Sequence, residues 1–331
     1  MSNGNEASLA LNEDRFNLLL NAASMYYEEG LTQQEISRRL GYSRSGISRL
    51  LSEAREAGIV EIRVHHPLMR NGEIERLLNE RFVLREARIL TSNSLPYAKL
   101  LRRNGELTAR FLEQTVRSDS VIGVSWGTNL NEVAYALRPP RYSDITVVQL
   151  VGALGTPDPQ IDGPELAQWF AQRFGGRYRT LPTPLIVDNA EVREALMNDR
   201  QVREVLNLAR QVDVAIVGIG SVVPELSSLV RAGYLTPDEI NEVAASGAVG
   251  DVCAIQFDID GNVLDLPISR RVVGVEADTL RQIPLVLGIA AGKVKAPAIL
   301  GALRAGLING LVTDDVAARE VLRLGNNQNS G

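Results

Sequence analysis

Cysteine and histidine are nearly missing from this sequence of 331 residues. Cys253 is the only cysteine, and the two histidines, His65 and His66, are neighbours. A single cysteine cannot form an internal disulfide, which favours a reducing, cytoplasmic setting. Beyond residue 66 the chain has one thiol and no imidazole, so mainly carboxylates remain as ligands for a metal ion. We therefore expect no metal site.

Long apolar runs are missing as well. No stretch approaches the ~18 residues of a membrane-spanning helix, and the first ten residues lack the basic start and apolar core of a signal peptide. We therefore expect no membrane partner. The share of hydrophobic residues, 45%, is enough for a sizeable core. The length of the chain suits a small domain joined to a larger one.

Basic surface is scarce too, since the net charge of the chain is -5. The stretch 31–63 is an exception, with six arginines against four glutamates. Contacts to phosphates supply much of the affinity of a DNA-binding protein. A module that is only mildly basic is therefore expected to act in several copies.

The stretch from Leu31 to Gly58 has the pattern of a helix-turn-helix. Thr32 and Glu35 are spaced as a capping box, which satisfies backbone N–H groups at a helix start. Gly41 stands where a left-handed residue ends this helix, and Ser43 is placed to cap a second one. Two short helices joined by a tight turn are therefore predicted.

The second of these helices has an apolar side and a polar side. Ile47, Leu50, Leu51 and Ala54 fall on one stripe, and short hydroxyl side chains with an arginine fall opposite. The polar side suits a helix that lies in the major groove of DNA. The alternative is an ordinary helical hairpin with a solvated face. The residues expected to contact DNA are Gln33, Arg44, Ser45, Ser48, Arg49 and Ser52.

Three segments flank this motif. Apolar residues at helical spacing predict a supporting helix before it, and the alternation from Ile59 to Val64 predicts a strand after it. An amphipathic helix is predicted from Glu73 to Phe82. That helix either packs against the larger domain or forms a coiled contact between subunits. The apolar positions of the supporting helix are Phe16, Leu19, Leu20, Ala23 and Tyr27.

From about Arg88 to Leu324 short apolar runs alternate with amphipathic stretches. This pattern predicts an α/β domain with a mostly parallel sheet, in which ligands bind where strand ends meet loops and helix starts. The predicted strands are Val121–Val124, Ile145–Val151, Val212–Val217, Cys253–Asp258, Leu285–Ile289 and Leu307–Val312. The predicted helices include Gly105–Val116, Asn129–Leu137, Glu165–Phe174 and Ala296–Ala305.

The loop from Ser125 to Asn129 connects a predicted strand to a helix start. Converging N–H groups, hydroxyls and the helix dipole favour an anion such as phosphate there. The alternative is a tight turn capped by Thr128. The residues around Ser125 also spell G-x-S-x-G, the nucleophile elbow of α/β-hydrolases, but that chemistry needs a later histidine and the chain has none.

Two glycines, two lysines and an aspartate in later loops are further candidates. Gly218 and Gly220 start a dinucleotide fingerprint that Val223 interrupts, so we expect no cofactor and predict that a sugar or phosphate approaches these glycines. Lys293 and Lys295, two of only three lysines, lie near a helix start, where an ammonium is a good anion ligand. Asp251 is placed either to accept hydrogen bonds from sugar hydroxyls or to stabilise a turn.

Six blocks of the sequence together resemble the SorC family of bacterial sugar-responsive transcriptional regulators. LTQQEISRRLGYSRSGISRLLSEAREAGIVEIRV at 31–64 is similar to the DNA-binding module of that family. Five further blocks resemble its effector-binding domain in order and spacing. They are GVSWGT at 123–128, VVQLVGALG at 147–155, VDVAIVGIGS at 212–221, GAVGDVCAIQFDIDGNVL at 247–264 and KVKAPAILGALRAGLINGLVTD at 293–314.

The resemblance implies three parts. A three-helix helix-turn-helix domain is expected at 1–66, a linker and oligomerisation helix at 67–87, and a Rossmann-like, sugar-isomerase-like α/β effector-binding domain at 88–325. The resemblance also implies a homotetramer, a dimer of dimers, that binds a phosphorylated sugar or polyol. By position, the phosphate loop falls on Ser125, Gly127 and Thr128, and effector contacts fall on Gln149, Gly152, Asp251 and Lys295.

The sequence departs from the family at two positions, where Ala153 and Ala291 replace common glycines. Each added methyl group is expected to narrow the room near a backbone that touches the ligand.

The sequence thus predicts a cytoplasmic one-component transcription factor of a carbohydrate or polyol catabolic operon. Its partners would be double-stranded operator DNA and a phosphorylated sugar. One alternative is an enzyme, a sugar-phosphate isomerase or lactonase, with Asp251 as base and Lys295 holding phosphate, although a helix-turn-helix has no role in that chemistry. Another alternative is a structural DNA-bridging protein without an effector.

Overall fold

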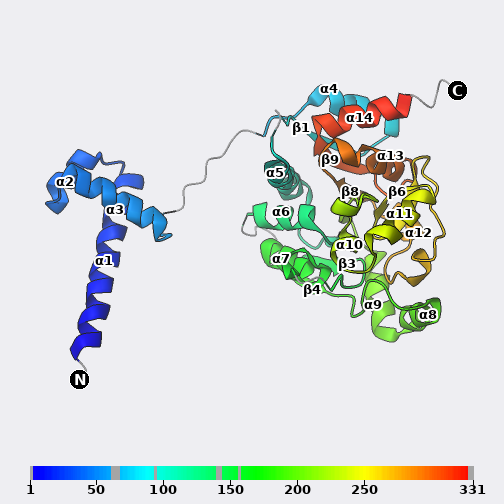
Figure 1. Ribbon diagram of the computed structural model, residues 1–331, viewed down its shortest axis with the longest axis horizontal. Coiled ribbons are helices and arrows are strands. Elements are labelled where there is room, and N and C mark those ends of the chain that lie inside the picture. The colour runs from blue at the N-terminus through cyan, green and yellow to red at the C-terminus, as the bar shows by residue number, and fades with distance from the viewer. Residues whose placement is uncertain (1–2, 61–67, 93–94, 139–143, 156–157, 327–331) are drawn as a thin grey trace. The chain divides into compact units, whose positions relative to one another are not determined.

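The structure is a computed structural model that describes residues 3–60, 68–92, 95–138, 144–155 and 158–326 (Figure 1). The chain divides into two compact units, Met1–Pro67 and Leu68–Gly331. Residues 68–87, which the sequence assigned to a linker and an oligomerisation helix, fall within the second unit. No helix in the described part of the chain is long and apolar enough to cross a membrane.

The first unit consists of three helices, α1 (Asn3–Tyr27), α2 (Gln33–Leu40) and α3 (Arg44–Glu56). The predicted capping box is present at the start of α2, and Gly41 ends that helix with a φ of 73°. Ser43 caps α3 by accepting a hydrogen bond from the N–H of Gly46. The predicted strand Ile59–Val64 lies for the most part outside the described residues. The core contains Leu19, Ala22, Ala23, Ile36, Ile47, Leu50, Leu51 and Ala54.

The buried face of α1 differs from the predicted one. Leu19, Ala22 and Ala23 are buried, whereas Phe16 and Leu20 are 52% and 47% exposed. The predicted apolar positions of α1 lie on two neighbouring strips of the helix surface, because a series of steps of three and four residues spans more than one strip. The position of α3 against α1 selects between these strips, and the sequence of α1 alone does not encode that position.

The second unit is built on a seven-stranded sheet in the order β1-β9-β8-β5-β2-β3-β4. All pairings within it are parallel. Two further strands, β6 (Ala248–Val252) and β7 (Ile255–Asp258), form a separate antiparallel hairpin. The strands of the large sheet are β1 (Glu86–Leu90), β2 (Val121–Val124), β3 (Thr146–Gln149), β4 (Arg177–Arg179), β5 (Val214–Gly218), β8 (Leu285–Ile289) and β9 (Gly310–Asp314).

The predicted α/β class with a mostly parallel sheet is confirmed, and β2 and β8 have the predicted bounds. The predicted strand Cys253–Asp258 was wrong in extent and placement. Its apolar residues belong to the hairpin, because Cys253 and Ala254 adopt positive φ values of 54° and 58° and turn the chain back. The sequence missed β1 and β4, which are short and contain charged residues.

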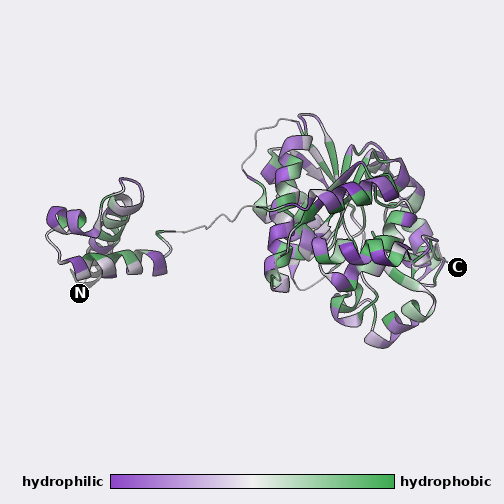
Figure 2. Ribbon diagram, turned by 90° about the horizontal axis from the view of Figure 1, so that it is seen from above, coloured by the Kyte–Doolittle hydropathy of each residue, from purple (hydrophilic) through white to green (hydrophobic). Residues whose placement is uncertain are grey.

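Helices cover both faces of the sheet, and the strands supply both cores. Along β5 the side chains alternate, so that Val214 and Ile216 enter one core while Ala215 and Val217 enter the other. Figure 2 shows helices with a hydrophilic and a hydrophobic side, as this arrangement requires. The helices are α4 (Gly72–Phe82), α5 (Tyr97–Thr115), α6 (Thr128–Ala136), α7 (Gly163–Phe174), α8 (Ala190–Asn198), α9 (Arg200–Ala209), α10 (Ser228–Arg231), α11 (Pro237–Ala245), α12 (Ala277–Gln282), α13 (Ala296–Arg304) and α14 (Asp315–Asn326).

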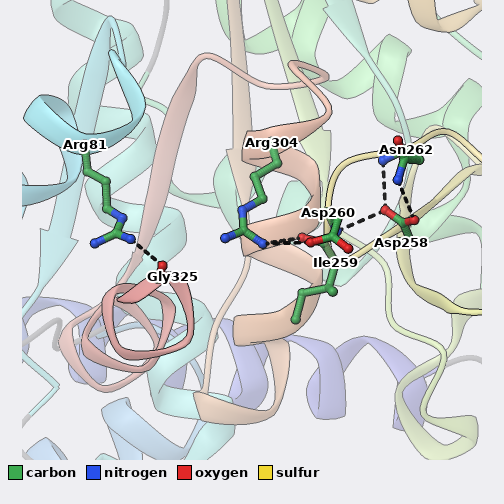
Figure 3. A network of polar contacts seen from close by, with 7 residues as sticks. All are labelled: Arg81, Asp258, Ile259, Asp260, Asn262, Arg304 and Gly325. Atoms are coloured by element: carbon green, nitrogen blue, oxygen red, sulfur yellow. Dashed lines mark hydrogen bonds and ion pairs between the residues drawn. The ribbon is translucent and has the colours of Figure 1, made fainter. Parts of the chain in front are cut away.

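Helix α4 packs against β1 and α14 of its own unit. Ile74 and Leu78 are buried in the core. Arg81 donates a hydrogen bond to the carbonyl oxygen of Gly325 on α14 (Figure 3). It donates another to the side chain of Asn326 on the same helix. The first of the two predictions for this helix, packing on the larger domain, therefore holds, and the contact between subunits stays a prediction.

The chain reverses its direction of winding between β2 and β5. After β2 it adds β3 and β4 toward one edge, and from β5 it adds β8 and β9 toward the other. At such a switch point the loop after one central strand runs to one face of the sheet and the loop after the other runs to the opposite face. A crevice then opens at the carboxyl ends of the two strands. The fold therefore predicts the ligand site beside the loops that follow β2 and β5.

The close packing of α5 on α6 generates a test. A Cβ added at Gly105 would lie 2.7 Å from the backbone carbonyl carbon of Glu132. We expect Gly105→Ala to destabilise the protein by about 1–3 kcal/mol through this clash, which outweighs the ~1 kcal/mol that alanine gains in a helix. Gly72→Ala is the matched control, because no atom lies within 4 Å of its added Cβ. Equal urea midpoints for Gly105→Ala and the wild type would contradict the packing.

Candidate functional site

A cavity of about 140 Å³ lies at the switch point. The loops after β2, β5 and β8 line it, together with the β6–β7 hairpin and the segment around α10. Seven of the nine effector-contact residues expected from the sequence line this one cavity. They are Ser125, Gly127, Thr128, Gly218, Gly220, Asp251 and Lys295.

The other two expected residues, Gln149 and Gly152, are not among the residues that line the cavity. Gln149 is fully buried, and its amide donates to the carbonyl oxygen of Val151 and accepts from the N–H of Leu181. Gly152 lies against another chain segment, since an added Cβ would be 2.3 Å from the carbonyl oxygen of Pro184. Both residues have structural roles that account for their identity.

The two alanines that depart from the family pattern do not line the cavity either. Ala291 is completely buried in one of the two cores. The carbonyl oxygen of Ala153 accepts a hydrogen bond of 3.2 Å from the Tyr234 hydroxyl. Their methyl groups therefore do not narrow this cavity, contrary to the expectation.

The start of α6 supplies backbone donors to the cavity. Gly127 precedes the helix with a φ of 115°, a conformation that favours glycine. No side chain caps α6. Among the described residues, the N–H groups of Thr128 and Asn129 have no hydrogen-bond partner. Unpaired N–H groups and the positive end of the helix dipole together make this position suitable for an anion.

Lys295 brings a buried positive charge to the same cavity. Its side chain is 5% exposed, and Nζ donates to the carbonyl oxygen of Ile219 at 2.9 Å. Burial lowers the pKa of Lys295 from 10.5 to about 8; the carboxylate of Asp251 opposes this shift and Arg231 adds to it. Lys293, the neighbouring lysine, points elsewhere, since its side chain is 67% exposed and lies 3.8 Å from Glu320.

Asp251 is the acidic group of the cavity. Its Oδ2 accepts a hydrogen bond from the N–H of Ala254, so the carboxylate stabilises the hairpin turn as well as lining the cavity. Burial raises the pKa of Asp251, and Lys295 opposes the shift. An added Cβ at Gly220 would lie 1.8 Å from Oδ1 of Asp251. The absence of a side chain at Gly220 therefore leaves space for this carboxylate, whereas the sequence analysis predicted that a sugar or phosphate occupies that space.

Several lining residues were missed by the sequence reading. Arg231, an exposed residue at the end of α10, brings a second cation, and Tyr97 brings a phenol whose pKa burial raises. The indole of Trp126 donates to the Ser228 hydroxyl at 3.1 Å, which ties the α10 segment to the β2 loop. No local motif marks these residues, because the folded chain brings α5 and α10 to the cavity from distant sequence positions.

The Ser125 hydroxyl is hydrogen-bonded to the backbone of β5. Ser125 is 2% exposed, and its hydroxyl accepts a hydrogen bond from the N–H of Gly218. The described residues contain no cluster of three or more potential metal ligands. In the loop after β7, Asp258 accepts hydrogen bonds from the backbone N–H and the side-chain amide of Asn262 (Figure 3).

The first unit presents the expected polar face of α3. Arg44, Ser45, Ser48 and Arg49 are exposed, whereas Gln33 and Ser52 are partly exposed. Within the described residues, no carboxylate forms an ion pair with Arg44 or Arg49. Ser52 accepts a hydrogen bond from Arg55. The exposed guanidinium and hydroxyl groups on one side of α3 are therefore available to DNA.

A helix-turn-helix unit joined to a parallel α/β domain with a cavity at its switch point defines the class of one-component, ligand-binding transcription factors. Residues 66–323 match the family model described as "Putative sugar-binding domain", and residues 23–67 match that of the MarR family. The chain belongs to the SorC family of transcriptional regulators with a sugar-binding domain. Members of this family are regulators, and the isomerase or lactonase alternative has no support.

The chain is similar over nearly its whole length to known regulators. It is 32% identical to the deoxyribonucleoside regulator of Bacillus subtilis, over 94% of this chain and 99% of that protein. It is 35% identical to the transcriptional regulator LsrR of an Enterobacter species, over 96% of both chains. The crystal structure of the sorbitol operon regulator SorC from Klebsiella pneumoniae matches with a TM-score of 0.72 and 30% identity, over 93% of this chain and 98% of that one.

The pKa of Lys295 predicts how the affinity of the cavity for a phosphate should depend on pH. A phosphate monoester is a dianion above pH ~6, and Lys295 is protonated below a pKa of about 8. As the pH rises through that pKa the ammonium loses its proton and its attraction for the dianion. We expect the affinity for a sugar phosphate, measured by titration calorimetry, to fall about tenfold between pH 7 and pH 9. Lys293→Met should keep this profile, and a flat profile in the wild type would contradict the assignment.

Proposed function

We propose that this protein is a cytoplasmic regulator that binds double-stranded operator DNA through residues 31–58 and a phosphorylated sugar or polyol in the switch-point cavity. The observation that carries the proposal is the convergence of two anion-binding features on one cavity. The unpaired N–H groups at the start of α6 and the buried ammonium of Lys295 both line it. A phosphate group satisfies both features, and a neutral sugar does not.

The remaining polar groups suit the carbohydrate part of the ligand. The phosphate would lie between Thr128 and Lys295, with Arg231 adding positive charge. The carboxylate of Asp251 would accept hydrogen bonds from hydroxyls, since a carboxylate is an acceptor that disfavours a phosphate beside it. Sugar hydroxyls and one dianionic group then match the two cations and one carboxylate that line the cavity.

For the DNA-binding unit we propose that α3 lies in the major groove. Arg44, Ser45, Ser48 and Arg49 would contact bases or phosphates, with Gln33 and Ser52 at the margin of the contact. Exposed arginines without carboxylate partners support this role. Two modules would bind half-sites separated by one or more helical turns of DNA, about 34 Å each.

We further propose a homotetramer that is a dimer of dimers. In each chain, 1–66 would be the DNA-binding domain, 67–87 the linker with the oligomerisation helix, and 88–325 the effector domain. The stretch 31–63 of the DNA-binding unit is only mildly basic, which supports several copies acting together. Two of the relatives are regulators named for sorbitol and for deoxyribonucleosides, which supports control of a carbohydrate or polyol catabolic operon. A typical coupling between effector and DNA would be about 1–3 kcal/mol.

A thermal-shift screen against sugar phosphates tests the effector. A ligand at a hundred times its dissociation constant should stabilise the protein by ~2.7 kcal/mol. We expect Lys295→Met to lose this response, because it removes the buried ammonium, and Lys293→Met to keep it, because Lys293 does not line the cavity. Stabilisation by non-phosphorylated sugars alone, or an undiminished response in Lys295→Met, would contradict the proposed phosphate site.

The DNA contact is tested by Arg49→Ala. Loss of one arginine contact to a base should weaken specific operator binding by about 1–3 kcal/mol, measured by fluorescence anisotropy. The effector-induced thermal shift should be unchanged, since Arg49 and the cavity lie in different compact units. Arg319→Ala, which removes an exposed arginine from α14, controls for net charge. If both variants bind the operator like the wild type, Arg49 makes no contact with DNA.

A further inference from the structure

Helix α8 (Ala190–Asn198) has no buried residue. Every other α-helix of eight or more residues described in that unit buries at least one. Arg193 holds α8 in place by donating to the carbonyl oxygen of Val272 at 2.7 Å and to Glu276 at 3.0 Å. Leu196 and Met197 are partly buried and pack against the core. The other six residues of α8 apart from Arg193, among them Val192 at 42%, are exposed, so most of the helix surface is open to a partner.

The exposed side of α8 is acidic. Glu191 and Glu194 are both exposed and lie three residues apart, so they share one helix face. The only cation of α8 is Arg193, which the contacts above occupy. Within the described part of the chain, neither Glu191 nor Glu194 forms an ion pair. This face therefore presents two unpaired negative charges.

Helix α9 (Arg200–Ala209), which follows α8 directly, presents the opposite charge. Its exposed side lines a groove of about 560 Å³. Glu204, the one carboxylate there, lies 3.9 Å from Arg200. Among the described residues no carboxylate pairs with Arg203 or Arg210. The lining residues are Met197, Arg200, Arg203, Glu204, Leu206, Asn207 and Arg210.

We propose that the α8–α9 surface is an interface between two copies of this chain. The acidic face of α8 in one copy would lie in the arginine groove of α9 in the other, and the reverse contact would occur at the same time. In an interface with two-fold symmetry each surface must complement itself, and adjacent acidic and basic helices satisfy this condition. The half-exposed side chains of Met197 and Leu206 give the groove an apolar floor.

The position of this surface is compatible with an assembly. Figure 1 shows α8 and α9 at one end of the second unit, away from α4 and α14. A contact at α8–α9 therefore leaves α4 free for the other contact that a dimer of dimers requires. This inference rests on the proposed homo-oligomer, but it does not depend on the identity of the effector.

Charge reversal in the full-length chain tests the interface by sedimentation velocity over a range of protein concentrations. R203E/R210E should weaken self-association at least about tenfold, because like charges then face each other twice across the symmetry axis. E191R/E194R should weaken it to a similar extent. The variant that combines all four substitutions should associate within about threefold of the wild type, since the pairs are restored with reversed sign. The association of the wild type should weaken with added salt.

R117E/R319E is the control, because it changes the net charge equally at exposed positions outside this surface. If a reversal does not fold, R203Q/R210Q should show a smaller loss in the same direction. A monomeric wild type, unchanged association in both reversals, or no recovery in the combined variant would overturn the proposal. Loss in the arginine reversal alone would also overturn it, because the groove would then bind a different acidic surface. The thermal shift with sugar phosphate should persist in all variants, which separates failure of the interface from failure of the effector site.

Discussion

The buried ammonium of Lys295 is the constraint on which the rest of the effector site depends. A cation is costly to remove from water unless it has partners, and the carbonyl oxygen of Ile219, 2.9 Å away, satisfies only one of its three donors. Burial lowers the pKa of this group to about 8 but leaves it charged at neutral pH. A dianionic ligand in the cavity would compensate that charge and use the unpaired N–H groups of α6. Removal of water makes burial of the ammonium unfavourable, but it also strengthens the attraction between the ammonium and a phosphate, because charges interact more strongly at low dielectric.

The parallel sheet explains why these groups meet. Ser125 follows β2, Gly218 ends β5 and Lys295 follows β8, and the three strands are neighbours in the sheet although they are far apart in sequence. Because all three run parallel, their carboxyl ends reach the same edge. The reversal of winding between β2 and β5 leaves this edge open as a cavity. The first unit has its own small core, so the helix-turn-helix and the cavity lie in separate units. A ligand can influence DNA binding only if it binds two arrangements of the protein with different affinity.

Local signals were readable from the sequence, and long-range neighbours were not. Thr32, Gly41 and Ser43 each bond to a group within four residues along the chain, so the start and end of α2 followed from local chemistry. The rarity of lysine and the helix start pointed to Lys293 and Lys295 alike, and the family resemblance selected Lys295, which does line the cavity. In contrast, Arg231 and Tyr97 reach the cavity only through the folded topology, and no spacing rule marks them. The resemblance of sequence blocks to a family suggested Gln149 and Gly152, but close packing against Leu181 and Pro184 accounts for both. The apolar run ahead of Asp258 was read as part of the parallel sheet, because periodicity does not reveal which strand lies beside which.

The central claim is that the phosphate of a sugar phosphate lies between the start of α6 and Lys295. A crystal structure of the full-length protein with a stabilising sugar phosphate tests it most directly. The account predicts phosphate oxygens within hydrogen-bond distance of the Thr128 N–H and of Lys295 Nζ, with a sugar hydroxyl beside Asp251. An ordered sugar phosphate whose phosphate contacts neither Thr128 nor Lys295 would contradict it.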